Sequence, residues 1–143
     1  MWVNTAFTEY AKRLSQEITL QLIEVKPEKR TGIKNKERIL DAEYQRIKAA
    51  IPSGCRLVVL DERGKQWSTV FLADVIENWM QEGCDTVFVI GGADGLHEAL
   101  KSSAHTTFSL SSLTFPHGLV RVILAEQLYR AISLIKNHPY HRI

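Results

Sequence analysis

Two short runs of only apolar residues constrain the fold of this chain most strongly. Residues 57–60 read LVVL and residues 87–90 read VFVI. Wholly apolar runs of this length are typical of strands buried on both faces of a parallel sheet. Each run is followed by a turn and then by a stretch in which apolar residues recur at helical spacing. The sequence therefore predicts an α/β fold with a mainly parallel sheet.

The other elements are predicted from apolar spacing, caps and turn residues. Helices are expected from the cap Asn4 to about Leu14, over 39–51, from the cap Ser68 to Gly83, over 96–103 and over 118–136. Strands are expected over 18–25, where apolar and polar residues alternate, and over 107–110, with loops over 26–36, 61–67 and 111–117. Because a domain has roughly 150 residues, we expect one domain over 1–143 whose core needs neither metal nor disulfide.

Composition excludes several classes of protein. With 45% hydrophobic and 24% charged residues, the chain is neither collagen, nor low-complexity disorder, nor a disulfide-stapled miniprotein. Cys55 and Cys84 stand far apart and form no C-x-x-C motif, so we expect buried, reduced thiols in a cytoplasmic protein, with no zinc site or redox motif. Arg121, Glu126 and Arg130 interrupt the longest apolar stretch, so no membrane span is expected. The first residues lack the pattern of a signal peptide.

Charge is unevenly distributed along the chain. The first fifty residues carry 10 basic and 7 acidic side chains, residues 51–100 carry 3 and 8, and residues 101–143 carry 5 and 1. Basic ends allow an anionic partner, and an ordinary solvated surface is the alternative. The same two interpretations apply to the basic loop, whose cations can contact phosphates. These cations are Lys26, Lys29, Arg30, Lys34 and Lys36.

The carboxyl ends of the predicted strands are the expected ligand edge, because α/β sheets bind ligands there. Three segments follow these ends: the turn after Leu60, the glycine turn 91–95 and the loop after Leu110. The sequence GGADG matches neither G-x-G-x-x-G nor the P-loop, so a nucleotide-phosphate site is not expected. A ligand loop and a plain strand-to-helix turn both remain open. The serines of the 109–112 segment lack a G-x-S-x-G elbow, so serine hydrolysis is not expected.

The end of the chain places chemically active groups close together. His138, Tyr140, His141 and Arg142 supply two imidazoles, a phenol and a guanidinium within five residues. Such groups can hold an anion or move a proton near neutral pH, and a frayed terminus is the alternative. Two histidines three residues apart lack a third nearby ligand, so we expect no metal.

These motifs occur together with further characteristic segments along nearly the whole chain. The segments are Trp2-Val3, Phe7-Thr8-Glu9-Tyr10, Leu60-Asp61, Gly91-Gly92-Ala93-Asp94-Gly95-Leu96, Ser109-Leu110-Ser111, Pro116-His117, Val120-Arg121, Glu126-Gln127-Leu128-Tyr129-Arg130-Ala131 and Asn137-His138-Pro139-Tyr140-His141. In this combination the chain resembles the ribosomal RNA large-subunit methyltransferase H family of the SPOUT class. The glycine turn alone is a weak signal, but joined to the LYRA helix and the HPYH tail it is very specific.

The resemblance implies a methyltransferase that uses S-adenosylmethionine. Its family substrate is a pseudouridine of the large-subunit (23S) rRNA, methylated at N3 within the assembled ribosome. It also implies a deep trefoil knot at the carboxyl end, which is an exception to the rule against threaded chains, and a homodimer with the active site at the subunit interface. Two alternatives remain open: a SPOUT methyltransferase that acts on another RNA, and a non-catalytic RNA-binding or ribosome-binding module.

The resemblance also assigns site residues. The expected cofactor pocket comprises Leu60, Gly91, Gly92, Ser111, Ser112, Leu113, Thr114, Phe115 and Pro116. Arg142 or His141 is expected to stabilise the anion formed at N3, and Tyr140 to position the base. The basic loop is expected to hold the RNA backbone. No metal takes part.

The sequence departs from the family pattern in one large way. Family members carry a further strand ahead of the Trp-Val pair, whereas Met1 directly precedes Trp2 here. We therefore expect the first strand of the family's sheet to be missing, which can expose a sheet edge or leave a groove beside the strand predicted at 18–25.

Overall fold

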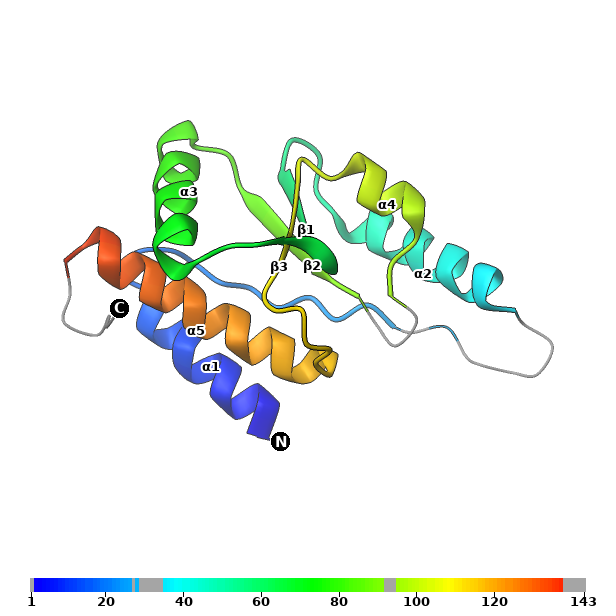
Figure 1. Ribbon diagram of the computed structural model, residues 1–143, viewed down its shortest axis with the longest axis horizontal. Helices are drawn as coiled ribbons and strands as arrows, with labels where there is room; N and C mark the ends of the chain where they lie inside the picture. The colour runs from blue at the N-terminus through cyan, green and yellow to red at the C-terminus, as the bar shows by residue number, and fades with distance from the viewer. Residues whose placement is uncertain (1, 27, 29–34, 92–94, 138–143) are drawn as a thin grey trace.

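The architecture is a three-stranded parallel sheet with helices on both faces (Figure 1). The computed structural model describes residues 2–26, 28, 35–91 and 95–137. In chain order its elements are α1 (Trp2–Leu14), α2 (Lys36–Ala50), β1 (Arg56–Gln66), α3 (Thr69–Glu82), β2 (Thr86–Ile90), α4 (Glu98–Ser103), β3 (Thr106–Ser109) and α5 (His117–Ile135). The strand order is β2-β1-β3 and both pairings are parallel. The predicted α/β class with a parallel sheet is therefore confirmed.

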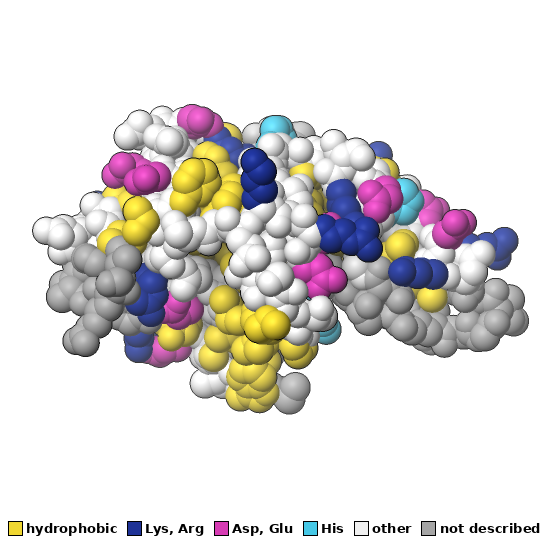
Figure 2. Space-filling model, in the orientation of Figure 1, with side chains coloured by type: hydrophobic (Ala, Val, Ile, Leu, Met, Phe, Trp, Pro, Cys, Tyr) yellow, Lys and Arg dark blue, Asp and Glu magenta, His cyan; other side chains and the backbone are white. Residues whose placement is uncertain are grey.

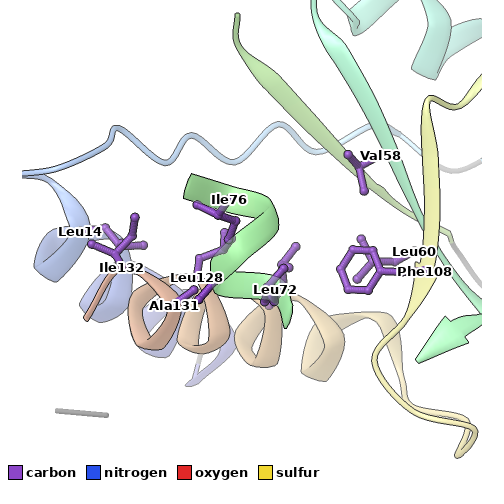
Figure 3. Close-up of a cluster of buried hydrophobic side chains, with 11 residues drawn as sticks. Leu14, Val58, Leu60, Leu72, Ile76, Phe108, Leu128, Ala131 and Ile132 are labelled. Atoms are coloured by element: carbon purple, nitrogen blue, oxygen red, sulfur yellow. The ribbon is translucent and has the colours of Figure 1, made fainter. Parts of the chain in front are cut away.

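The central strand β1 separates two hydrophobic clusters, because alternate side chains of a strand point to opposite faces. Val58 and Leu60 belong to the cluster under α1, α3 and α5, which Figure 3 shows. Leu57 and Val59 belong to the cluster under α2 and α4. All four side chains are buried, as expected for a strand that is covered on both faces.

The register of the sheet brings three strand ends to one edge. Leu60 of β1 pairs with Ile90 of β2 on one side and with Phe108 of β3 on the other. The turn after Leu60, the glycine turn and the loop after β3 therefore leave the sheet side by side. This arrangement confirms the expectation that the three segments share the carboxyl edge.

Helix ends follow the predicted caps in most places. The Ser68 side chain accepts a hydrogen bond from the backbone N–H of Phe71 at the start of α3, and Gly83 ends that helix with a φ of 78°. The prediction for Asn4 was wrong, because α1 begins at Trp2 and Asn4 lies inside its first turn.

The strand predicted at 18–25 was also wrong. These residues are neither helix nor strand, and no strand pairs with them in the described part of the chain. Ile18 and Leu20 instead pack against the cluster under α1, α3 and α5. An extended segment can bury one side in this way without a hydrogen-bonded neighbour, so an alternating pattern alone does not establish sheet pairing.

The loop predicted at 61–67 was wrong as well, since β1 continues to Gln66. Leu60 and Lys65 both pair with Phe108, so the four residues between them bulge out of the ladder. A Cβ on Gly64 would lie 2.9 Å from both the Cα and the carbonyl carbon of Phe108. The two backbones touch where β1 rejoins β3, and only glycine fits there.

Replacing Gly64 with alanine should lower the free energy of unfolding by about 1–3 kcal/mol, because the added methyl group collides with backbone that must shift. Denaturant unfolding followed by circular dichroism measures the change. Gly118→Ala is the control: its new methyl group meets only the Val3 side chain, at 3.3 Å, and alanine favours a helix. Equal stabilities of Gly64→Ala and the unmodified chain would contradict the close backbone contact.

Candidate ligand pocket

A hollow of about 230 Å³ opens at the carboxyl edge of the sheet. Its lining comes from all three strand ends, from the segment before α4 and Lys101 of that helix, and from the loop before α5 and the start of that helix. The lining residues are Leu60, Asp61, Glu62, Ile90, Gly91, Gly95, Leu96, Lys101, Ser109, Leu110, Ser111, Leu113, Thr114, Phe115, His117 and Val120.

Most of the predicted pocket residues meet at this hollow. Leu60, Gly91, Ser111, Leu113, Thr114 and Phe115 all line it. Ser112 and Pro116 do not: Ser112 is exposed, and Pro116 is the N-cap residue of α5. Gly92 lies outside the described residues.

Hydrogen bonds hold the loop between β3 and α5 in place. The buried Ser109 hydroxyl donates to the backbone oxygen of Ser111 at 2.6 Å and accepts from the Ser111 N–H at 3.1 Å. The Thr114 hydroxyl donates to Glu62 at 2.8 Å and so joins the loop to the bulge of β1. The hydroxyl groups of Ser109 and Thr114 therefore stabilise the conformation of this loop.

The glycine turn packs against itself beside the hollow. A Cβ on Gly91 would lie 3.0 Å from Cγ of Leu96 and 3.1 Å from the carbonyl carbon of Gly95. Gly95 has a φ of 79°, which side chains rarely tolerate. Both glycines also line the hollow, so the close packing of the turn shapes this part of its wall.

An ion pair lies in the lining of the hollow, and the sequence analysis assigned it no role. The Lys101 ammonium group of α4 is 3.2 Å from the Asp61 carboxylate, and both side chains are largely buried. Burial raises the pKa of the Asp61 carboxyl, but a hydrogen bond from the backbone N–H of Arg63 and the ammonium group of Lys101 outweigh it. The pKa of Asp61 therefore lies below its usual range. An acidic residue directly after an apolar strand was the available sequence signal.

The structure describes only some of the remaining predicted site residues. Lys26 and Lys36 are exposed, and Lys36 opens α2. The other three cations of the basic loop, Lys29, Arg30 and Lys34, lie outside the described residues, as do Tyr140, His141 and Arg142.

Three further observations bear on the excluded chemistries. No helix in the described ranges is long and apolar enough to cross a membrane. Within those same ranges, no three His, Cys, Asp or Glu side chains come together as metal ligands. Both cysteines are free, but Cys84 is exposed and Cys55 is half-buried, so the expectation of buried thiols was wrong. Both lie just before strands, where the chain passes over the surface.

Comparison with known proteins identifies the family. The family described as "Predicted SPOUT methyltransferase" matches residues 1–141. Proteins named "Ribosomal RNA large subunit methyltransferase H" from Nitrosospira multiformis and Nitrosomonas eutropha are 59% and 55% identical to this chain over 141 residues, and one from Ralstonia pickettii is 56% identical over 142 residues. Each alignment covers 99% of this chain and 90% or 91% of the relative. The chain belongs to the SPOUT methyltransferases and, among them, to the ribosomal RNA large-subunit methyltransferase H family.

Proposed function

We propose that this chain is an S-adenosylmethionine-dependent methyltransferase that acts on N3 of a pseudouridine in the 23S rRNA of the assembled ribosome. The observation that carries the proposal is the placement of the pocket: the segments expected to hold the cofactor meet in one hollow at the carboxyl edge of the sheet. The relatives named as large-subunit rRNA methyltransferases support the choice of RNA. Residues 1–143 form one such domain, which works in the cytoplasm.

The hollow suits an adenosyl group chemically. Leu60, Ile90, Leu96 and Phe115 offer apolar walls for a flat base. Backbone N–H and C=O groups can bind adenine without an acidic side chain, and Gly91, Thr114 and Phe115 line the hollow with backbone of this kind. S-adenosylmethionine supplies an electrophilic sulfonium methyl group when bound.

The protein's part in the reaction is to position the base and to stabilise charge. N3 of a pyrimidine carries a proton at neutral pH, and a base must accept this proton before N3 can attack. A cation beside N3 stabilises the resulting anion. We assign this role to Arg142 or His141, and the positioning of the base to Tyr140.

We further propose a homodimer with the active site at the subunit interface. The described hollow has a volume of about 230 Å³, below the roughly 300–1,000 Å³ of most small-molecule sites, which fits a site that a second protomer extends. Figure 2 shows hydrophobic side chains gathered over the starts of α1 and α5. Trp2 and Leu113 are 62% and 68% exposed. Sedimentation equilibrium at micromolar concentration should give twice the mass of 16.3 kDa; a monomer would contradict the dimer.

The carboxyl end is proposed to form the deep trefoil knot of the class. The proposal rests on the membership of the chain in the SPOUT methyltransferases. An electron-density trace in which α5 passes outside the loops that precede it would contradict the knot.

Methyl transfer from labelled S-adenosylmethionine tests the function. Intact ribosomes from cells that lack this enzyme should accept about one methyl group each at a pseudouridine N3 of the 23S rRNA, located by mass mapping, whereas free 23S rRNA should accept far less. Methylation confined to another RNA would establish the alternative SPOUT activity. Binding to the ribosome without binding of S-adenosylmethionine would establish the non-catalytic module.

RNA contact by the basic loop has its own expected result. Replacing both Lys26 and Lys36 with glutamine should weaken binding to the ribosome. The slope of log(kcat/KM) against log[salt] should also become shallower by about 1–2, because fewer counterions are released. Lys48→Gln is the control, since Lys48 is exposed at the other end of α2. If the methylation rate of the unmodified enzyme does not change with added salt, contact between the basic loop and the RNA is contradicted.

A further inference from the structure

We infer that Asp61 makes the pocket prefer a positively charged adenosyl ligand over a neutral one, and that Lys101 sets how strong this preference is. The inference rests on the proposed function and deepens it. It concerns the distinction between S-adenosylmethionine, whose sulfonium gives it one net positive charge, and the product S-adenosylhomocysteine, a thioether with no net charge.

The first support is the position of the two charges. Both side chains line the hollow, Asp61 at the end of β1 and Lys101 in α4. They are 16% and 21% exposed, so solvent screens them less than an ordinary surface pair. A unit charge added or removed here is felt by a ligand in the same hollow.

The second support is that Asp61 is held in its charged form. One of its carboxylate oxygens accepts the backbone N–H of Arg63 at 3.1 Å, and the other faces Lys101 at 3.2 Å. Both partners stabilise the carboxylate and keep the pKa of Asp61 low. The group is therefore ionised, and fixed in place, throughout the neutral pH range.

The third support is the balance of charge in the lining. Among the carboxylate and ammonium groups of the described lining, Asp61 and Glu62 carry two negative charges and Lys101 carries one positive charge. Lys101 lies closer to Asp61 than to Glu98, whose carboxylate is 3.4 Å away and 81% exposed. Lys101 thus mainly offsets Asp61. Removing Lys101 makes the pocket more negative, and removing the charge of Asp61 makes it less so.

The charge of the pocket affects turnover through the relative affinities for the methyl donor and for the product. A pocket with a stronger negative charge would hold the methyl donor more tightly relative to the product, which has no net charge, whereas a positive pocket would favour the product over the donor. The pair therefore tunes the exchange of product for a new donor.

Isothermal titration calorimetry of the full-length protein without RNA tests the inference, because no turnover occurs. The measured quantity is the ratio of the Kd for S-adenosylhomocysteine to the Kd for S-adenosylmethionine. Lys101→Met should raise this ratio roughly 3- to 10-fold, and Asp61→Asn should lower it by a similar factor. The double variant Asp61→Asn/Lys101→Met restores the net charge and should return the ratio toward that of the unmodified protein. Glu77→Gln is the control: Glu77 is exposed on α3 and does not line the hollow, so the ratio should stay nearly unchanged.

The outcomes separate this inference from the proposed function. Ratios that stay constant while both ligands still bind, or that move in the same direction in both single variants, would overturn the role of the pair and leave the methyltransferase intact. A double variant whose ratio departs from that of the unmodified protein as far as either single variant does would show a structural effect and also overturn it. If the unmodified protein binds neither ligand, the proposed function fails and the inference fails with it.

Discussion

Replacing Phe108 with alanine should lower the free energy of unfolding by about 3–5 kcal/mol. Phe108 is 1% exposed and is among the largest fully buried side chains of the described chain. Its ring stacks on Trp67 with centroids 4.3 Å apart and planes 4° from parallel. Figure 3 shows it beside Leu60 in the cluster under α1, α3 and α5. Its loss leaves a cavity between β1, β3 and α3 that rigid neighbours cannot fill.

Denaturant unfolding at one fixed protein concentration measures this effect, since the stability of a dimer depends on concentration. Phe71→Ala is the matched control. Phe71 also contacts Trp67, with centroids 5.2 Å apart, but it is 49% exposed, so its removal should cost under about 1 kcal/mol. If both variants lose the same stability, Phe108 does not have the central place in the core that its burial indicates.

Replacing Arg142 with alanine should abolish methylation, with a loss in kcat of about 100-fold or more, while the affinity for S-adenosylmethionine stays nearly unchanged. The reason is the proposed chemistry: a cation that stabilises the N3 anion acts when charge develops, not when the cofactor binds. Single-turnover methylation of ribosomes measures the rate, and titration with S-adenosylmethionine measures the affinity for the cofactor.

Two further variants show which group carries this role. Arg142→Lys keeps a positive charge and should retain part of the activity, although lysine lacks the planar fork of arginine. His141→Ala should lose the pH dependence of the rate near neutrality if the imidazole is the group that acts. An Arg142→Ala variant with the rate of the unmodified enzyme would refute the assignment to Arg142.

The strands and helices that the sequence predicted correctly are those whose signal is local. The apolar run at 57–60 marks a buried strand because helices cover both of its faces, and burial of each residue follows from its own side chain. Ser68 and Gly83 mark the ends of α3 because capping uses the residue's own atoms and backbone. Such features need no knowledge of distant parts of the chain.

The elements that the sequence missed depend on distant partners. Residues 18–25 have a strand pattern, but no neighbouring strand accepts them in the described fold. Lys65 and Gln66 are polar and were assigned to a loop, yet they pair with Phe108 and Ser109 through their backbones. Pairing is decided by the strand that lies alongside, and composition does not report it.

The candidate site divides in the same way. Leu60, Gly91 and the loop after β3 could be placed together because parallel strands end at a common edge. Lys101 could not, because it enters from α4 and its position depends on how that short helix packs. A single lysine in a helix has no periodicity that points to a pocket.

The bulge of β1 determines which wall of the hollow can move. Residues 61–64 form this bulge, and the residues on both sides of it, Leu60 and Lys65, pair with the same residue of β3, Phe108. The wall that carries Asp61 is therefore anchored at two points and cannot swing outward without breaking the sheet. The described loop after β3 is joined to this bulge by one exposed hydrogen bond, between Thr114 and Glu62. The two walls of the hollow are therefore held differently, one by strand pairing and the other by side-chain hydrogen bonds.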